Sequence, residues 1–534
     1  MGLTLAALLA WLGVASLVIE ADAGHCSGSR AVCISRRSLE ILSWADVHGA
    51  LLGKGLPWAS GRSFFRNEQV LQFRMPSDRT QRFAPMLNLQ QYYLEQFVFE
   101  AARRRGSLAQ LRWATRVVAL RQAEGGVEIE VQAGQRPPQT LTADYLVACD
   151  GARSTVREQL GLSLQGVQYD GRYVIVDIEQ ETQRETERLA WFDPPSNPGS
   201  TILMHRQPDK VWRIDYQLRD DEDPLEAVKP ENVLPRVQRH LTMIGEHAPW
   251  KALWISIYNA KCLTLDRYRH GRVLLAGDAA HLVPIFGVRG LNSGLDDAAN
   301  LAWKLAAVLE GAADPALLDT YSDERVQAAR ENIVYGAKST EFMAPPNFAF
   351  SLMRDAALRL ARSDARVRSL INPRQTAPVA YPGSSLNAPD IAAAAFEAGA
   401  RPGEPAPEAL LESAGGAFHL TQAFGAGMVL LHFTQAAQDG AGLTALCAAL
   451  QMGSLQARAL RIHPAGTSSA GGCTDLHGQA AQRYGAPLGA LVVVRPDGYV
   501  LGRWARPDWA ALGEQLAAMI RCSTAHGAHK AQAA

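Results

Sequence analysis

Cysteine is scarce in this sequence and is not arranged for covalent or metal chemistry. The 534 residues include seven scattered cysteines and no C-x-x-C pair: Cys26, Cys33, Cys149, Cys262, Cys447, Cys473 and Cys522. An odd, scattered set indicates neither a disulfide framework nor a zinc site. It is typical of buried or incidental thiols in a reducing cytosol. We therefore expect no metal site and a cytoplasmic location.

An excess of charge of either sign is also missing. Lysine and arginine together number 53, and aspartate and glutamate also number 53. This balance gives no indication of a nucleic-acid partner or of an anionic membrane surface. The contents of 47% hydrophobic and 20% charged residues are those of an ordinary globular protein. At about 150 residues per domain, the length predicts about three domains.

The N-terminal stretch lacks both a basic leader and an unbroken apolar run. Its first 24 residues, MGLTLAALLAWLGVASLVIEADAG, contain no lysine or arginine, and the first basic residue is Arg30. A secretory signal begins with a positive segment. A membrane span needs about 20 apolar residues, whereas Gly13 and Glu20 interrupt this stretch. The pattern instead predicts a helix, a glycine turn and a short buried strand closed by an acid, the second half of a dinucleotide-binding βαβ unit.

Alternating apolar and polar positions predict two blocks of strands. One runs from Leu108 to Val131, and the other from Arg172 to Leu218 with a further strand near 253–260. The second block is typical of an antiparallel sheet with one buried face. Helices are predicted from Ser293 to Leu309 and over most of 312–370.

The last part of the chain begins after a stretch rich in Pro, Gly and Ala, residues 372–407, which is typical of a linker. A compact α/β block follows. It contains the strand MVLLHF at 428–433, a hairpin around the turn PDG in GALVVVRPDGYVLGRW, and a final helix near 508–520.

The strongest local pattern is GRVLLAGDAAHLVPIFGVRGLNSGLDDAANLAWKL, residues 271–305. A buried strand ends at Gly277 and Asp278, a Gly/Pro loop follows, and a long helix begins near Gly290. An aspartate after a strand accepts hydrogen bonds from sugar-like hydroxyls, and the first turn of a helix offers free N–H groups to an electron-rich group. Gly-Asp alone is an ordinary turn, but the whole arrangement predicts a cofactor site. We expect the adjacent His281 to have a packing role.

Three further stretches complete the pattern. DYLVACDGARSTVREQLG at 144–161 predicts a strand, a tight turn at Asp150 and Gly151, and a helix. RAVCISRRSLEIL at 30–42 begins a helix with arginines, and LQQYYLEQFV at 89–98 contains a Q-x-x-L-E segment. Taken singly, Arg37 and Gln91 have the alternative of being solvated surface residues.

In this order the four stretches resemble the motifs of the class A flavoprotein aromatic hydroxylases. That family includes the p-hydroxybenzoate, phenol and 3-(3-hydroxyphenyl)propionate hydroxylases. The resemblance covers nearly the whole chain and implies an α/β fold. It implies a Rossmann-like FAD-binding domain like that of p-hydroxybenzoate hydroxylase, an antiparallel-sheet substrate domain, and a C-terminal thioredoxin-like domain like that of the phenol hydroxylase branch.

The resemblance assigns roles to single residues. Asp278 would bind the ribityl chain of FAD, the loop of Pro284 and Gly287 would lie along the isoalloxazine, and the turn after Asp150 is associated with both FAD and reduced nicotinamide. The implied cofactor-binding residues are Gly2, Glu20, Arg30, Gln91, Val117, Asp150, Gly151, Arg153, Gly277, Asp278, Pro284, Gly287, Gly290, Leu291 and Asn292. No side chain is expected to be catalytic, because the chemistry belongs to the flavin. Val288 stands where relatives commonly have glycine, and we expect it to narrow the flavin loop.

The N-terminus departs from the family in one respect. Members open with a strand and G-x-G-x-x-G, whereas here Gly2 matches the last glycine and Glu20 the acid that binds the adenosine ribose. The first strand and two glycines, about 10–15 residues, are absent, and those glycines bring the backbone close to the pyrophosphate. We expect a start placed too late or a fragment. A real loss of FAD binding is the alternative.

The resemblance also divides the chain into domains. The first part of the FAD-binding domain would be 1–165, the substrate sheet 166–262, the second FAD part with its helices 263–371, a linker 372–399, and the thioredoxin-like domain 400–534. Without C-x-x-C the last domain cannot perform dithiol chemistry. We expect it to have a structural or dimer-interface role.

The implied function is hydroxylation of a phenolic or other activated aromatic substrate, with NAD(P)H and O₂, through a flavin C4a-hydroperoxide. The alternatives are a halogenase or isoprenoid reductase of the same fold, or a truncated non-catalytic flavoprotein. The W-x-W-x-I-P stretch of tryptophan halogenases is missing, which counts against a halogenase. The implied partners are a small aromatic substrate and O₂. The substrate's identity, the choice of NADH or NADPH and the formation of a homodimer stay open.

Overall fold

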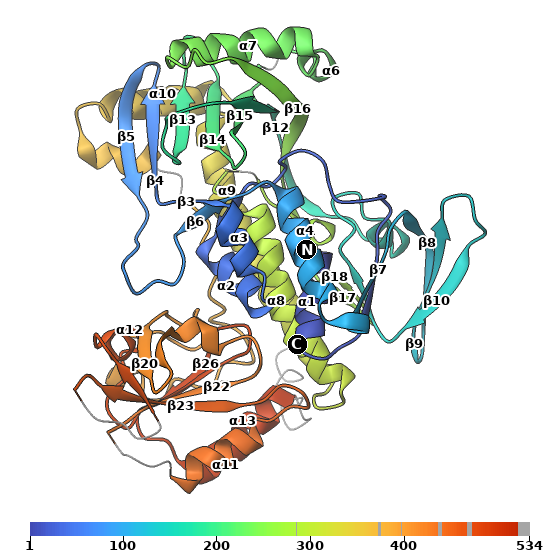
Figure 1. Ribbon diagram of the computed structural model, residues 1–534, viewed down its shortest axis with the longest axis vertical. Helices are drawn as coiled ribbons and strands as arrows, with labels where there is room; N and C mark the ends of the chain where they lie inside the picture. Colours follow the sequence, from blue (N-terminus) through green and yellow to red (C-terminus); the bar gives the residue numbers. More distant parts are fainter. Residues whose placement is uncertain are drawn as a thin grey trace.

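The computed structural model describes residues 1–219, 221–284, 286–371, 375–396, 398–435, 440–466 and 472–521. Figure 1 shows a large sheet at the top, helices in the middle, and a second sheet with its own helices below. The upper sheet has eight strands and the lower sheet seven. This is the mixed α/β architecture that the sequence predicts. Cys522 and the other residues of 400–534 that follow Arg521 lie outside the described residues.

The N-terminal stretch folds as its pattern predicts. Gly2–Trp11 form helix α1, and Ser16–Ile19 form strand β1 after a turn at Gly13. Helix α1 is apolar around its whole circumference, and it is buried because it packs against both α4 (Gln91–Arg103) and α8 (Gly290–Leu309). This packing accounts for the apolar character of the helix.

Short parallel strands carry the predicted motifs. β1 pairs in parallel with β7 (Ala109–Arg112), and β11 (Leu146–Ala148) pairs in parallel with β18 (Val273–Leu275). Within the described part of the chain, β7 is the only strand that pairs with β1, and β18 the only one that pairs with β11. Glu20, Asp150 and Asp278 all follow the carboxyl ends of parallel strands, where ligands bind in open α/β sheets.

The large sheet has the order β19-β16-β12-β15-β14-β13-β4-β5, and its neighbours are antiparallel except for the parallel pair β13–β4. Two of its strands, β4 and β5, come from a region for which the sequence predicted no strand. The strand bounds are β4 Ser60–Phe65, β5 Glu68–Arg74, β12 Gln165–Gln180, β13 Arg188–Phe192, β14 Thr201–Arg206, β15 Val211–Gln217, β16 Trp250–Thr264 and β19 His281–Leu282.

The two faces of this sheet differ. One face is apolar and packs under helix α7 (Pro230–Met243), through side chains such as Val176, Ile214 and Val237. The opposite face meets Phe286 and the end of helix α9 (Leu317–Met343). We call this opposite face the inner face, because it is turned toward the 271–305 motif.

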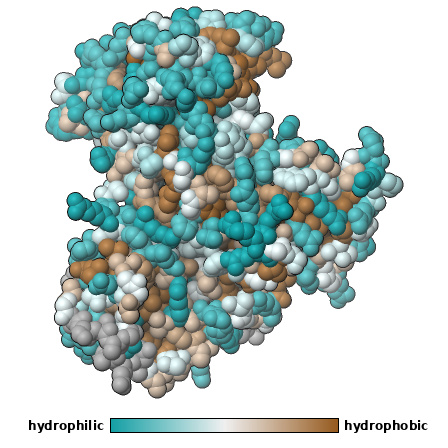
Figure 2. Space-filling view, viewed as in Figure 1, coloured by the Kyte–Doolittle hydropathy of each residue, from teal (hydrophilic) through white to brown (hydrophobic). Residues whose placement is uncertain are grey.

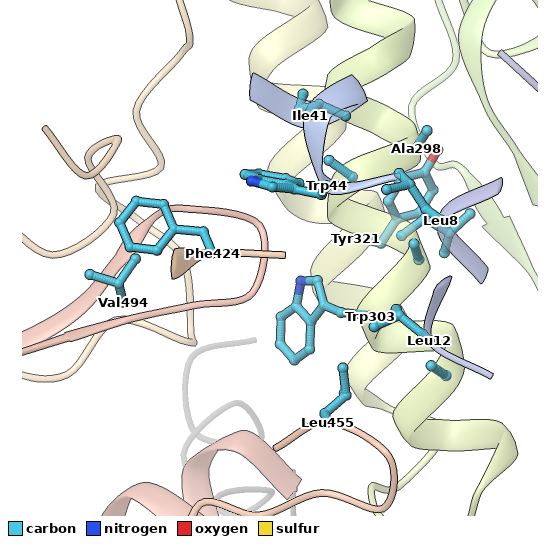
Figure 3. Close-up of a cluster of buried hydrophobic side chains, with 14 of the residues drawn as sticks. Leu8, Leu12, Ile41, Trp44, Ala298, Trp303, Tyr321, Phe424, Leu455 and Val494 are labelled. Carbon is cyan, nitrogen blue, oxygen red and sulfur yellow. The ribbon is translucent and has the colours of Figure 1, made fainter. Parts of the chain in front are cut away.

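The helices in the middle share one core with the lower sheet. Trp44 of α2 (Arg36–Trp44) and Trp303 of α8 lie where the middle helices meet the last part of the chain (Figure 3). Phe424 and Val494 approach from that side, and all four side chains are buried. The last part of the chain therefore closes the hydrophobic core of the first.

The lower sheet has the order β21-β20-β24-β23-β22-β25-β26. Strands β24, β23 and β22 run parallel, and β25 and β26 add an antiparallel hairpin whose turn is the predicted PDG. The bounds are β20 Leu410–Ser413, β21 Gly416–His419, β22 Val429–Phe433, β23 Arg458–Pro464, β24 Cys473–Asp475, β25 Leu491–Val494 and β26 Val500–Trp504, with helices α11 Ala441–Ala449, α12 Gln479–Tyr484 and α13 Trp509–Arg521.

The remaining elements connect these parts. Their bounds are β2 Cys33–Ser35, α3 His48–Lys54, β3 Leu56–Trp58, β6 Met86–Asn88, β8 Thr115–Ala123, β9 Gly126–Ala133, β10 Gln139–Ala143, α5 Thr155–Gln159, α6 Pro224–Ala227, β17 Arg269–His270 and α10 Phe348–Leu360. Hydrophilic residues cover most of the visible face over α7 (Figure 2). None of the described helices is long and apolar enough to cross a bilayer.

A buried ion network joins the two parts of the chain. Arg495, in the PDG hairpin, donates to Glu324 of α9 at 2.6 and 2.9 Å and to Asp497 at 3.0 Å. Lys304 of α8 donates to the same glutamate at 2.8 Å. These four side chains are almost inaccessible to solvent, so each charge depends on its partners.

Replacement of Arg495 tests this network. Arg495→Leu leaves the carboxylates of Glu324 and Asp497 buried with less compensation, and we expect a loss of about 3 kcal/mol in the free energy of unfolding. Urea unfolding followed by circular dichroism measures it. Arg506→Leu, at an exposed position of the same segment, is the matched control and should change stability by less than about 0.5 kcal/mol. Equal effects of the two substitutions would contradict the network.

Candidate functional site

The Gly277–Asp278 turn is held by one buried carboxylate. Gly277 follows β18 with a φ of +59°, and its N–H donates to Asp297 Oδ2 at 2.8 Å. Arg325 Nε donates to the other oxygen of Asp297 at 2.6 Å, and His281 Nε2 lies 2.8 Å from Oδ2. Burial raises the pKa of Asp297, but His281 and Arg325 outweigh this effect and hold the pKa well below its usual value. His281 is buried beside this carboxylate, and its packing role stays a prediction.

Asp278 occupies a different environment from Asp297. Its side chain is exposed, yet the surrounding protein restricts its hydration and raises its pKa, against the opposing effect of His281. A carboxyl group that is open to solvent and also partly desolvated lies in a concave part of the surface. It is therefore available to hydrogen-bond a ligand that lies along this turn.

The first turn of α8 faces the same region. Arg289 at the N-cap supplies no side-chain cap, so the first N–H groups of the helix depend on other acceptors. The side chain of Asn292 is fully used within the protein. Its oxygen accepts from Ser35 N at 2.9 Å and Ser38 Oγ at 2.7 Å, and its nitrogen donates to the carbonyls of Cys33 and Val288.

The loop before α8 has two consecutive residues in the left-handed region, Gly287 with φ +87° and Val288 with φ +54°. This conformation is unfavourable for a β-branched residue. Val288 packs against an apolar cluster that includes Val32, Trp58 and Met86. The packing and the bond from Asn292 hold it there. The position thus requires the conformation that glycine adopts, and Val288 adopts it under strain.

The second motif is built around its own aspartate. Asp150 accepts hydrogen bonds from Ser154 Oγ at 2.5 Å and from Val156 N at 3.1 Å. The second bond satisfies an N–H group in the first turn of α5. Gly151 has a φ of +77°, and Arg153 is exposed beyond it. Val117 lies on β8, which packs against α5.

The remaining predicted residues lie at the N-terminal side. A Cβ at Gly2 would come within 3.3 Å of the Cys149 side chain, so glycine allows α1 to approach the end of β11. Glu20 accepts from Asp22 N at 2.9 Å, and Gln91 accepts from Ala31 N at 3.3 Å. Arg30 is exposed, with a φ of +45°.

Helix α8 is the element that brings these positions together. It packs against α1, α2 and the turn Gly277–Ala279, and so groups Gly2, Asp278 and Gly290. Pro284 is buried in the loop before the helix. Val117, Asp150 and Arg153 lie around α5, and Arg157 of α5 donates to the carbonyl of Ala279 in that turn at 3.1 Å.

Sequence reasoning missed Asp297, Arg325 and a row of buried polar residues on the inner face of the large sheet. The one available signal for Asp297 was an acid within the apolar run LDDAANLAWKL. A pocket of about 370 Å³ between α6 and α7 lies on the other face of that sheet, away from the motifs.

Comparisons with known proteins bear directly on this site. A family model described as "FAD binding domain" matches residues 1–334. A 3-(3-hydroxy-phenyl)propionate/3-hydroxycinnamic acid hydroxylase of Mycolicibacterium smegmatis is 30% identical over 359 residues, which are 67% of this chain and 62% of the relative. A rifampicin monooxygenase of Streptomyces venezuelae is 33% identical over 62% of this chain and 67% of that protein. The chain thus spans less than two thirds of the first of these relatives.

Solved structures share the fold. The flavin-dependent monooxygenase PieE, in complex with FAD and substrate, superposes with a TM-score of 0.82 at 23% identity, over 98% of this chain and 97% of that one. The OxyS anhydrotetracycline hydroxylase of Streptomyces rimosus gives a TM-score of 0.71 at 26% identity, over 97% and 96%. The whole architecture, including the last part of the chain, is therefore shared with these proteins.

Asp297→Asn tests the buried carboxylate. The substitution leaves the guanidinium of Arg325 buried without its counter-charge, and we expect a loss of about 3 kcal/mol in unfolding free energy at pH 7. Because the pKa of Asp297 is depressed in the folded state, its stabilisation is complete above about pH 4 and declines as the pH falls further. The stability difference from the wild type should therefore narrow below pH 4 in urea titrations. Asp323→Asn, at an exposed position of α9, is the control, and a pH-independent difference would contradict this role.

Val288 offers a test of backbone strain. Val288→Gly removes the cost of the left-handed conformation, whereas Val288→Ala loses the same packing and keeps that cost. We expect the glycine variant to be more stable than the alanine variant by about 1 kcal/mol, the reverse of the usual order in regular structure. Thermal unfolding of both variants measures the difference. An alanine variant as stable as the glycine variant would exclude strain at this position.

Proposed function

The chain belongs to the FAD-binding-domain family, and we propose that it is an FAD-dependent monooxygenase that hydroxylates an activated aromatic ring, with NAD(P)H as reductant and O₂ as oxidant. The observation that carries this proposal is the turn at Asp278 beside the uncapped start of α8. There an exposed, partly desolvated carboxylate and free helix N–H groups lie next to a left-handed loop.

The groups present fit FAD. The carboxylates of Asp278 and Glu20 can accept hydrogen bonds from hydroxyls of a ribityl chain and a ribose. The N–H groups at Gly290 and Leu291 suit an electron-rich ring edge, and the backbone at Gly287 allows close approach of a planar ring. We propose that the other predicted residues, including Arg30, Gln91, Val117, Asp150, Gly151 and Arg153, contribute to the same cofactor or to reduced nicotinamide.

When bound, FAD supplies the two-electron redox chemistry and the activation of oxygen. The chain's own residues position and shield it. Asn292 fixes the loop through its bond to the Val288 carbonyl, and the cluster of Val32, Trp58, Met86 and Val288 excludes water beside that loop. Asp297 holds the turn that presents Asp278. No acid or base from the protein is required in this scheme.

The substrate is an aromatic compound held between the loop 284–288 and the inner face of the large sheet. Two matched proteins are named as a hydroxylase of 3-hydroxyphenyl acids and an anhydrotetracycline hydroxylase, and these names support a phenolic ring. The inner face supports it as well, because Tyr173 and Phe286 lie there with ring centroids 5.1 Å apart in an edge-to-face arrangement.

We also propose the domain division 1–165, 166–262, 263–371, 372–399 and 400–534, in which β4 and β5 join the sheet of the second unit. The parallel strands β24-β23-β22, the antiparallel hairpin and the flanking helices support a thioredoxin-like last domain. Its cysteines lack C-x-x-C spacing, which supports a structural or dimer-interface role. The use of NAD(P)H and the scattered arrangement of the cysteines support a cytoplasmic location.

Flavin binding and turnover test the proposal. The purified protein should carry FAD or take it up, and it should oxidise NAD(P)H with formation of a hydroxylated product from at least one phenol in a panel. Asp278→Ala should weaken FAD binding at least tenfold in fluorescence titrations, because it removes an acceptor for the ribityl chain. Asp144→Ala, an exposed acid near β11, is the control. A wild-type protein that takes up no FAD, or that oxidises NAD(P)H without hydroxylating any phenol, would exclude this function.

A further inference from the structure

Helix α10 has an apolar face that the described part of the chain leaves open to solvent. Four of its large side chains are more than half exposed: Phe348 at 80%, Leu352 at 59%, Met353 at 54% and Leu360 at 54%. Soluble monomers rarely expose several large apolar side chains next to one another, and such a group marks an interaction surface. In Figure 1, α10 lies at the upper left, far from the lower sheet.

The exposed residues form a ridge along the helix. Each member is four residues from the next: Phe348, Leu352, Ala356 and Leu360. Residues with this spacing lie on one face of an α-helix. The opposite side of α10, with Ala357 and Leu358, is buried in the cluster that also contains Tyr173 and Phe286. The helix is therefore largely apolar on both sides, which is typical of a helix that is covered on both sides.

Two charged residues border the ridge on a single edge. Asp355 and Arg359 are four residues apart, and at 100° per residue both lie close to the direction of Phe348. Arg359 is exposed, and the side chain of Asp355 is 37% exposed, with Arg354 Nε at 3.3 Å from its carboxylate. An acid and a base one turn apart on the same edge are complementary to the same edge of an antiparallel copy.

We propose that two copies of this chain pair through this face of α10, antiparallel about a two-fold axis. Such an axis brings the same surface of both copies together, and it places Asp355 of each copy level with Arg359 of the other. The ridge packs against its counterpart, because the i±4 ridges of two helices interdigitate. The small side chain of Ala356 allows the two helices to approach closely. This inference goes beyond the proposed function and does not depend on it.

Other occupants fit this face less well. The last residues of the chain, CSTAHGAHKAQAA at 522–534, contain no leucine, isoleucine, valine or methionine and no aromatic ring except histidine. They offer little apolar surface to cover the ridge. An anionic bilayer would repel Asp355, and the whole chain has no excess of basic residues. A second copy supplies both an apolar ridge and an opposite charge for each charged residue of the edge.

The pairing surface also affects the rest of each copy. Because the buried side of α10 packs into the cluster on the inner face of the large sheet, a partner on its outer side holds the helix against that cluster. The surface is separate from the lower sheet (Figure 1), so the last domain is left with a structural role.

Analytical ultracentrifugation of the full-length protein measures the pairing. We expect a dimer at about 100 μM, because interfaces of standard size have dissociation constants from micromolar to picomolar. Leu352→Asp places a charge on the ridge of both copies and should weaken the dimer about a hundredfold. Leu225→Asp, at a leucine of α6 that is 76% exposed, is the matched control and should leave the dimer intact. Both variants should keep the circular dichroism spectrum of the wild type.

Charge reversal tests the two-fold arrangement. In Arg359→Glu the new acid faces Asp355 of the other copy, and in Asp355→Lys the new base faces Arg359. Each variant alone should therefore pair about tenfold more weakly than the wild type. A mixture of the two variants again places an acid opposite each base. We expect it to form mixed dimers, which a tag on one variant identifies.

Three results would overturn the proposal. They are a wild type that stays monomeric at about 100 μM, a dimer that Leu352→Asp leaves intact, and charge variants that form no mixed dimer. Flotation with vesicles of anionic phospholipid tests the other occupant. A monomeric wild type that binds these vesicles, and loses them in Leu352→Asp, would assign the face to a membrane surface instead. Flavin binding and hydroxylation are measured separately, so none of these results decides the proposed function.

Discussion

The carboxylate of Asp297 is the interaction on which the cofactor side of the molecule depends. It accepts hydrogen bonds from the turn at Gly277 and from Arg325 of α9, and it contacts His281. Three segments distant in sequence therefore meet at one charge. A carboxylate has about four lone-pair sites on two oxygens to share among such donors, whereas an amide oxygen or a hydroxyl has about two. Because Gly277 is held in a left-handed conformation, the next residue, Asp278, reaches the surface while its neighbours are buried.

Buried charged contacts also hold the last part of the chain against the first. Arg37, at the start of α2, donates to Asp296 at 3.1 Å and also to the carbonyl of Asp497, and its guanidinium lies 5.2 Å from the Trp44 ring centre and 5.4 Å from that of Tyr499. Buried ion pairs add little net stability compared with apolar packing. We interpret these pairs as fixing where the lower sheet sits against α2 and α8. Arg37 is thus no surface charge, although its sequence context allowed that interpretation.

Local patterns predicted much of the fold. Helix α1, strand β1, the start of α8 within a few residues and the PDG hairpin all follow from periodicity and turn residues close together in the chain. Strands β4 and β5 were not predicted from the sequence. β4 is positioned by pairing with β13, a strand more than 100 residues later in the chain, in which Arg188 lies opposite Gly61. The strand, turn and helix of the 271–305 motif could be predicted for the same reason, because their signals are close together in the sequence. Asp297, Arg325 and Arg188 could not be predicted, because the role of a buried charged side chain depends on its surroundings in the fold. Those surroundings come from segments that are distant in the sequence.

The Arg495 network has a consequence for how the protein is made. Glu324 and Lys304 leave the ribosome well before Arg495 and Asp497. At about 5–20 residues per second the delay is on the order of ten seconds. During that interval Glu324 lacks the cation that makes its burial tolerable, and the core around Trp303 lacks its cover. Helices α8 and α9 can therefore close fully only near the end of translation. The proposed binding site, whose residues lie between Gly2 and Asn292, is thus assembled late, when its last contacts arrive from the other end of the chain.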